Sequence, residues 1–387
     1  MSKKIGCVIA YRKNHTNYGT SLVGYALIKK LQLLCKEVEV INYIKHPTIR
    51  EKIEIAINQI RVTGFWKFMV KRFQPKPTNL NYINGIKVRT KAVEAYKERK
   101  LIPLFHDYVG FRALQEGSRN YDAVVVGSDQ VWLPLGLKTK FFNLLFVDDS
   151  VRKVAYASSF GVSEIPSFQK KATARYLDRF YQISVREQRG KEIVDALSKN
   201  KAEVVADPTL LLDRYEWSEE IKESKALTSE PYIFCYFLGS NQEARRAANE
   251  LKAMKGCKII SIRHMDEFVE TDEQFGDEAP YDVDPNDFIK YIKDAEYVLT
   301  DSFHCSAFSI QFHQKFMTFY RFAVGSKGGR NSRIDSLFNV LGVPRDHIYQ
   351  GDISRVDAPI NWDEVDEKLV KLRNESLTYL KDALSRQ

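Results

Sequence analysis

The 387-residue chain has no long hydrophobic run and few cysteines. No stretch approaches the ~18 consecutive apolar residues that suggest a transmembrane helix. The apolar run at residues 5–11 is also too short for the core of a signal peptide, because polar residues follow it at once. The five cysteines are scattered and lack the CxxC spacing typical of zinc and redox sites. We therefore expect a cytoplasmic protein with free thiols, with peripheral contact at the inner face of the cell membrane as a further option.

The sequence also lacks the phosphate-binding and nucleophile motifs of several large enzyme classes. It contains neither GxxxxGK[ST] nor GxGxxG, so ATPases of the P-loop type and Rossmann dehydrogenases would be without their phosphate loops. The GxSxG motif of serine hydrolases is absent as well. The loop at residues 14–22 lies where a phosphate loop would be expected but has only one glycine. Substrate recognition must therefore be argued from individual side chains.

The rest of the composition is that of an ordinary folded enzyme with surplus positive charge. Apolar residues make up 44% of the chain and charged residues 28%, which is far from the balance of a disordered protein. The 59 Lys and Arg outnumber the 50 Asp and Glu by nine, so anionic partners are favoured. We do not expect a nucleic-acid partner, because none of the usual nucleic-acid-binding modules is present.

Most of the surplus charge lies in residues 45–76, which hold eight basic and two acidic residues in a predicted amphipathic helical stretch. Aromatic and apolar side chains are interleaved with these cations, namely Phe65, Trp66, Phe68, Met69 and Phe73. Two interpretations stay open. The segment is either a helix lying on anionic lipid or a helix packed over a cleft as one wall of a substrate site.

Strand and helix patterns alternate along most of the chain and predict an α/β fold of two Rossmann-like domains facing a cleft. A strand, a helix and a second strand open the chain, and further short apolar strands follow at 122–127, 153–161, 183–187 and 203–212. After the polar segment 213–230, strands are expected at 232–239, 257–262, 296–301 and 315–320. We predict an N-terminal domain at 1–225 with a basic helical insert at 45–120, a C-terminal domain at 226–345 and a helical tail at 346–387.

The sharpest local feature is TDSFHCSAFSI at residues 300–310. A buried strand ends at Asp301, Ser302 can cap the helix that follows, and His304 falls in its first turn. Free N–H groups and the helix dipole attract anions at such a point, and an imidazole there can exchange protons near neutral pH. The alternative is a capped helix with a purely structural histidine.

A second feature is VVVGSDQVW at residues 124–132, where a buried strand ends in polar side chains. Ser128, Asp129 and Gln130 present a hydroxyl, a carboxylate and an amide at the carboxyl end of the strand, where ligands bind in open α/β sheets. Trp132 can cover a sugar ring or fill the core. The alternative is a helix cap beside a packed tryptophan.

Several arginines are candidates for binding an anion. Arg186, in ISVRE, ends a strand, and its guanidinium matches phosphate or carboxylate with two hydrogen bonds. Its alternative role is an ion pair with Glu187 or another acid. Arg321 and Arg333 are further candidates, whereas Lys327 and Arg330 suit a solvated basic loop.

These segments together resemble one known family. NYGTSLVGYAL, VVVGSDQVW, AYASSFG, ISVRE, ADPTLLL and TDSFHCSAFSI occur in this order and are similar to the polysaccharide pyruvyl transferase family over about residues 5–345. The resemblance implies the two-domain architecture of glycosyltransferase B enzymes. It also implies transfer of a pyruvyl group from phosphoenolpyruvate to a hydroxyl pair of a glycan or lipid-linked saccharide, forming a ketal. The family pattern often has glycine after the histidine, where this chain has Cys305.

The resemblance and the local chemistry together suggest roles for individual residues. We expect the N-terminal domain to hold the acceptor and the C-terminal domain to hold the donor. His304 is the expected acid, and Asp301 or Asp129 would orient hydroxyls. The expected donor-binding residues are Arg186, Arg333, Ser302 and Gly239. The expected acceptor-binding residues are Asn17, Tyr18, Ser128, Asp129, Gln130 and Trp132.

This scheme requires no metal and no cofactor besides the donor substrate. Two other functions stay open. A nucleotide-sugar-dependent glycosyltransferase of the same architecture would also need arginines and a helix end for its diphosphate. A non-catalytic glycan-binding relative would bind without turnover.

Overall fold

The computed structural model describes residues 4–67, 69, 78–226, 230–265, 268–322 and 331–385. The strands are β1 (Lys4–Val8), β2 (Glu37–Ile44), β3 (Phe105–Val109), β4 (Ala123–Asp129), β5 (Arg152–Ser158), β6 (Gln182–Val185), β7 (Ala202–Val204), β8 (Tyr232–Tyr236), β9 (Lys258–Ser261), β10 (Tyr297–Thr300) and β11 (Phe316–Thr318). The helices are α1 (Tyr18–Leu34), α2 (Ile49–Thr63), α4 (Leu80–Lys100), α5 (Gly110–Ser118), α6 (Lys170–Leu177), α7 (Gln188–Leu197), α8 (Pro208–Leu211), α9 (Arg214–Glu220), α10 (Gln242–Lys255), α11 (Pro285–Lys293), α12 (Phe303–Gln311), α13 (Ser332–Leu341) and α14 (Trp362–Leu384).

Two separate parallel sheets confirm the predicted two-domain α/β architecture. The first has seven strands in the order β3-β2-β1-β4-β5-β6-β7. The second has four strands in the order β11-β10-β8-β9. The strand order reverses between β1 and β4 in the first sheet and between β8 and β10 in the second, and ligands bind beside such reversals in open α/β sheets. We therefore expect a ligand-binding site at the chain segments that follow β1, β4, β8 and β10.

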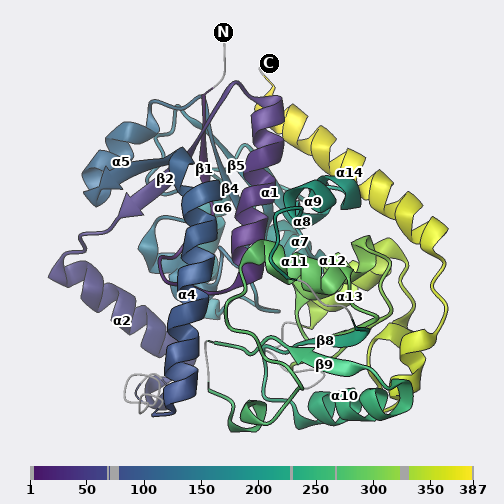
Figure 1. The fold of residues 1–387 in the computed structure, drawn as a ribbon. Coiled ribbons are helices and arrows are strands. Elements are labelled where there is room, and N and C mark those ends of the chain that lie inside the picture. Colours follow the sequence, from purple (N-terminus) through teal and green to yellow (C-terminus); the bar gives the residue numbers. More distant parts are fainter. Residues whose placement is uncertain are drawn as a thin grey trace.

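The segment 45–120, expected to be a helical insert, also supplies a strand. β3 pairs in parallel with β2 and forms one edge of the first sheet. Most of its residues are partly or fully exposed, so it lacks the apolar run that marked the other strands. Between β2 and β3 lie α2 and the 21-residue helix α4. α4 lies between the two halves of the molecule (Figure 1).

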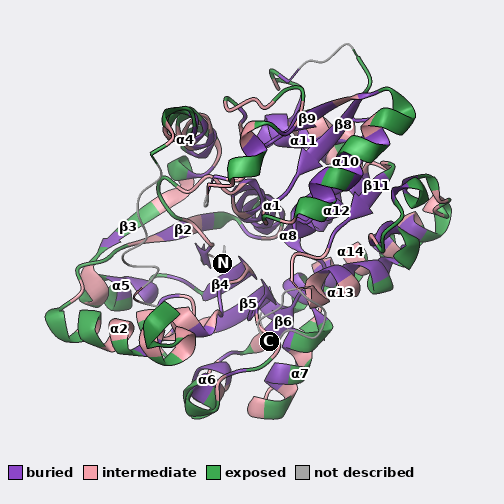
Figure 2. Cartoon of the chain, turned by 90° about the horizontal axis from the view of Figure 1, so that it is seen from below, coloured by how far each residue is buried: buried purple, intermediate pink, exposed green. Residues whose placement is uncertain are grey.

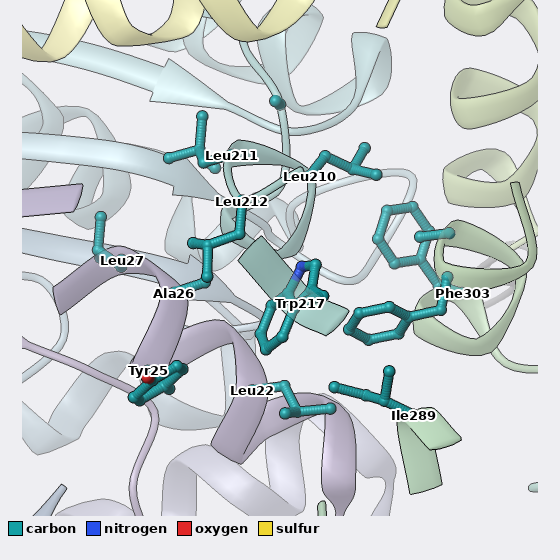
Figure 3. Close-up of a cluster of buried hydrophobic side chains, with 14 of the residues drawn as sticks. Leu22, Tyr25, Ala26, Leu27, Leu210, Leu211, Leu212, Trp217, Ile289 and Phe303 are labelled. Atoms are coloured by element: carbon teal, nitrogen blue, oxygen red, sulfur yellow. The ribbon is translucent and has the colours of Figure 1, made fainter. Parts of the chain in front are cut away.

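One hydrophobic core continues from the first half into the second. Leu22 of α1, Leu211 of α8 and Trp217 of α9 belong to one cluster of buried side chains (Figure 3). Phe308 of α12 belongs to the same cluster. Trp217 is fully buried and packs edge-to-face on Phe308, with ring centroids 5.2 Å apart. Because both halves contribute to this core, they are held together by apolar packing as well as by polar contacts.

The last helix, α14, connects the second half back to the first sheet. It runs along the outside of the molecule and ends beside the first sheet (Figure 1). Near that end, the Tyr379 hydroxyl donates to the Ala155 carbonyl at 2.9 Å, and the Ser376 hydroxyl oxygen accepts from the Ala206 N–H at 2.9 Å. Tyr379, Leu380 and Ala383 are buried there. The predicted helical tail is therefore an integral layer of the fold.

Candidate active site

A cleft of about 740 Å³ lies where the reversal points of the two sheets face each other. One wall comes from the segments after β1 and β4, from β2 and from the start of α1. The other comes from the segments after β8 and β10, from the start of α12 and from Arg333 on α13. A volume of this size is typical of sites that enclose a whole small ligand.

The charged groups that line the cleft are almost all positive. Four basic side chains line it (Arg12, Lys45, Arg321 and Arg333), together with the histidines His15, His264 and His304. Asp129 is the only acidic residue among the described residues that line it. Such a concentration of one sign in a concave site attracts ligands of the opposite sign. The cleft therefore suits an anionic ligand.

His304 lies at the N-terminus of α12, facing the first domain. Ser302 caps this helix, and its hydroxyl oxygen accepts the Cys305 N–H at 3.5 Å. The His304 side chain is 10% exposed, and its Nε2 lies 3.7 Å from Oδ2 of Asp207. Within the described part of the chain this nitrogen has no hydrogen-bond partner. His304 can therefore hold or release a proton at the cleft with a carboxylate behind it.

The imidazole of His304 fits against the first turn of α1 because residue 19 is a glycine. A Cβ placed on Gly19 would lie 2.1 Å from Nδ1 of His304 and within 3 Å of two further ring atoms. Only a residue without a side chain allows the two domains to approach so closely here.

Gly19→Ala should therefore displace the imidazole and reduce turnover by about 100-fold, the order of loss expected from a misplacement of about 1 Å. Steady-state kinetics and a thermal melt would measure the two effects separately. Gly136→Ala is the matched control, because a Cβ at Gly136 would meet no atom within 4 Å. Unchanged turnover in Gly19→Ala would show that the position of His304 is not critical.

Directly beneath the cleft, Arg186 joins three carboxyl groups. Its fully buried guanidinium donates to Oδ2 of Asp207 at 2.9 Å and to Oδ1 of Asp129 at 3.0 Å, and its Nε lies 3.6 Å from Oε2 of Glu187. Oδ1 of Asp207 accepts from the N–H and the hydroxyl of Thr209 at 3.0 and 2.8 Å. A buried charge needs such pairing to be stable. The network therefore supports both Asp129 in the cleft and Asp207 behind His304.

The three carboxyl groups differ in their proton affinity. Burial by itself raises the pKa of Asp207, but the neighbouring His304 and then Arg186 more than offset it, so the pKa ends well below its usual range. Burial also raises the pKa of Asp129, and the charge of Arg186 reverses this, leaving the pKa lowered. For Glu187 burial outweighs the charge of Arg186, so its pKa is raised. Asp129 and Asp207 are thus anionic at neutral pH.

Seven of the predicted site residues lie together along the cleft. They are Asn17, Asp129, Gln130, Ser302, His304, Arg321 and Arg333. Asn17 also caps α1, since its side-chain oxygen accepts the Thr20 N–H at 3.1 Å. The Thr20 hydroxyl in turn donates to Oδ2 of Asp129 at 3.2 Å. Segments far apart in the sequence therefore meet at one site.

The other predicted site residues are placed behind the lining. Arg186 lies in the buried network, and Ser128 donates to the Ala157 carbonyl at 2.6 Å. The carboxylate of Asp301 accepts the N–H groups of Leu238 and Gly239 at 2.6 and 2.9 Å, so Asp301 and Gly239 shape the loop after β8.

Tyr18 and Trp132 serve in packing. Tyr18 is fully buried between the domains, stacks on Phe288 and donates to the Val283 carbonyl at 3.0 Å. Trp132 packs against Phe160 and donates from Nε1 to the Phe142 carbonyl at 3.1 Å. Of the two roles weighed for Trp132, the structure shows the core position. A role in acceptor binding for either residue would have to be indirect.

Some residues of the site were not picked out from the sequence as functional. Asp207 was included only as part of ADPTLLL, one of the segments that carry the resemblance. Three further cleft residues follow the strands β1 and β2, namely Arg12, His15 and Lys45. Because ligands bind at the carboxyl ends of strands in open α/β sheets, their positions after predicted strands could have marked them as candidates. His264 follows β9 in the same way. Lys327 and Arg330 lie outside the described residues.

Two features are absent from the described ranges. No helix there combines the length and the apolar character needed to cross a membrane. No three His, Cys, Asp or Glu side chains in those ranges gather as they would around a metal ion.

Comparison with known proteins gives one family match. The family model of polysaccharide pyruvyl transferase matches residues 17–321. No curated protein matches the chain. Similar solved structures include UDP-GlcNAc 2-epimerase from Neisseria meningitidis bound to UDP-GlcNAc, with 10% identity, a TM-score of 0.45 and coverage of 97% of this chain and 100% of that one. Another is Anabaena Alr3699/HepE in complex with UDP and glucose, with 8% identity, a TM-score of 0.48 and coverage of 98% and 99%. The range matched by the family model contains Arg186, Asp207 and His304.

Proposed function

Because the chain belongs to the polysaccharide pyruvyl transferase family, we propose that it moves the pyruvyl group of phosphoenolpyruvate onto two hydroxyls of a sugar, in a glycan or glycan precursor, and forms a ketal. The observation that carries this proposal is the cationic cleft with His304 on its wall. Phosphoenolpyruvate bears a phosphate and a carboxylate on three carbons, so it needs several cations and a proton donor close together. The cleft offers both.

The second domain provides the better site for the donor. Arg321 and Arg333 line this wall beside the N-terminus of α12, and guanidinium groups and free helix N–H groups both bind phosphate and carboxylate. Arg321 is held in place by Asp301, whose Oδ2 lies 3.5 Å from its Nε. Arg186, first expected to touch the donor, would instead act from beneath by holding Asp129 and Asp207.

The proposed reaction is balanced by one proton gained at carbon and two lost from the acceptor. His304 protonates the methylene carbon of phosphoenolpyruvate, and the positive charge that develops at the adjacent carbon is attacked by the first sugar hydroxyl. The bond from this carbon to the phosphate oxygen then breaks and inorganic phosphate leaves. The second hydroxyl attacks the same carbon and closes the ketal. Of the two protons released by the hydroxyls, one replaces the proton of His304 and the other leaves with phosphate or solvent.

Two carboxylates support these steps. Asp207 lies behind His304 and stabilises the protonated imidazole by its charge. Asp129 is the only described carboxylate on the cleft wall, and it can accept a hydrogen bond from a sugar hydroxyl and orient it. Its lowered pKa suits orientation better than proton removal. The scheme uses no cofactor besides the donor.

Phosphate release tests this proposal. Incubation with phosphoenolpyruvate and a panel of saccharides, free and lipid-linked, should release one inorganic phosphate per ketal formed. Mass spectrometry should show an acceptor heavier by the mass of pyruvic acid less one water. Release of a nucleoside diphosphate from nucleotide sugars, with no phosphate from phosphoenolpyruvate, would identify a glycosyltransferase instead. Saccharide binding without turnover of any donor would identify a non-catalytic relative.

A further inference from the structure

Helix α2 exposes apolar side chains and buries a polar one, the reverse of an ordinary surface helix. Ile49, Ile53 and Ile57 are spaced by four residues and so share one face, and their exposed fractions are 77%, 53% and 51%. The buried residue of the helix is Asn58. Its amide donates to the carbonyls of Pro134 and Leu135 at 3.2 and 3.3 Å. Hydrogen bonds of Asn58 thus attach the helix to the domain, and most of the α2 ribbon is exposed or intermediate (Figure 2).

The apolar face continues beyond the helix end. Gly64 ends α2 with a positive φ of 83°, and the exposed rings of Phe65 and Trp66 follow. Trp66 is 79% exposed. Trp and Phe beside aliphatic residues are typical of helices that lie in the interfacial layer of a bilayer. An uncovered apolar surface of this kind needs a partner.

Cations border this apolar face on both sides. From the helical period of 100° per residue, Arg50 and Arg61 lie on one flank of the isoleucine stripe and Lys52 lies on the other. Lys52, Arg61 and Lys67 are exposed, and the side chain of Arg50 is 89% exposed. Of the two acids on α2, Glu51 is engaged in a capping box with Thr48 and Glu54 pairs with Arg50 at 3.4 Å. The net charge of the face is therefore positive.

From this combination we propose that α2 with Phe65 and Trp66 docks the protein on an anionic lipid surface. The isoleucines and aromatic rings enter the headgroup layer, while the flanking cations bind lipid phosphates. No residue of α2 lines the cleft, so within its described residues the segment 45–76 contributes Lys45 to the cleft wall and not this helix. It begins only four residues after the cleft residue Lys45, a span of at most about 14 Å. Docking would therefore bring one rim of the cleft to the membrane.

Vesicle co-sedimentation tests this proposal without any use of catalysis. The wild-type protein should sediment with vesicles of phosphatidylglycerol and phosphatidylcholine and should sediment little with phosphatidylcholine alone. Ile53→Ser/Ile57→Ser should weaken binding by about tenfold or more, and Lys52→Gln/Lys67→Gln by about fivefold per charge removed. Because all four side chains are exposed, the variants should keep their circular dichroism spectra and melting temperatures. Val370→Ser, at a half-exposed position of α14, is the matched control.

The remaining outcomes also decide the question. Failure of the wild-type protein to sediment with anionic vesicles would overturn the proposal, as would equal binding by the Ile53→Ser/Ile57→Ser variant. The alternative partner for the exposed face of α2 is a second copy of the chain. Light scattering on the protein without vesicles would detect such a dimer. A dimer that disperses in the isoleucine variant, without vesicle binding by the wild type, would assign the face to self-association. Each result is independent of which reaction the cleft performs.

Discussion

His304→Gln should lower turnover with phosphoenolpyruvate by about 10²–10⁴-fold, the contribution typical of a positioned general acid. Glutamine keeps much of the volume and can donate a hydrogen bond, but it cannot transfer a proton to carbon. Because Asp207 keeps its hydrogen bonds to Arg186 and Thr209 when His304 is replaced, the variant should stay folded. Phosphate release under saturating donor and acceptor measures the effect on the chemical step.

The matched control is His106→Gln. His106 lies on the edge strand β3 with half of its side chain exposed, and it does not line the cleft. Its replacement should leave turnover within about twofold of wild type, since exposed substitutions have small effects. Donor binding by His304→Gln, measured by calorimetry, should persist because the arginines are intact. Turnover near the wild-type rate in the folded variant would disprove the assignment of the acid.

Arg186→Met should destabilise the protein by about 3–5 kcal/mol, the cost of leaving buried charges without their partner. Methionine preserves the apolar stem but removes the only side chain that binds both Asp129 and Asp207 among the described residues. The midpoint of denaturant unfolding should fall with little change in slope. Arg112→Met removes an exposed i,i+4 pair with Glu116 and should leave the unfolding midpoint unchanged, because exposed ion pairs contribute little to stability.

The loss caused by Arg186→Met should shrink in acid. A carboxylate with a lowered native pKa stabilises the fold above the ordinary aspartate pKa of about 3.9, and this stabilisation is lost as the pH falls through the native value. Asp129 and Asp207 are of this kind. The wild type therefore has more stability to lose on acidification than the variant. Most of this loss falls below the ordinary aspartate pKa, so unfolding curves at neutral pH and near pH 3 would compare the two proteins. A difference that stays constant would show that the carboxylates are not responsible.

The sequence could predict which residues lie at strand ends. It could not predict which of their side chains point into the cleft and which point into the protein behind it. Asp129 and Gln130 reach the cleft, whereas Ser128 turns toward Asp207 and the carbonyl of Ala157. Side chains alternate in direction along a strand, so neighbours in one motif face different surroundings. That alternation cannot be assigned without the register and twist of the neighbouring strands.

Contacts between segments far apart in the sequence could not be predicted from local sequence patterns either. The pairing of His304 with Asp207 joins the two domains, and the fit of Gly19 against the imidazole depends on how closely they approach. The competition among three carboxyl groups for Arg186 likewise arises only when the ends of β4, β6 and β7 meet. By contrast, the helix cap at Ser302 and the position of His304 in the first turn of α12 follow from adjacent residues and could be predicted.

The return of α14 to the first sheet bears on how the chain folds as it is synthesised. The strands of the first sheet leave the ribosome early, but the buried side chains Tyr379, Leu380 and Ala383 that cover part of it emerge about 200 residues after β5, roughly 10–40 s later at ordinary translation rates. During this interval an apolar surface around Ala155 and Tyr156 lacks its native cover. The N-terminal half therefore cannot complete this part of its core until the end of the chain has been synthesised.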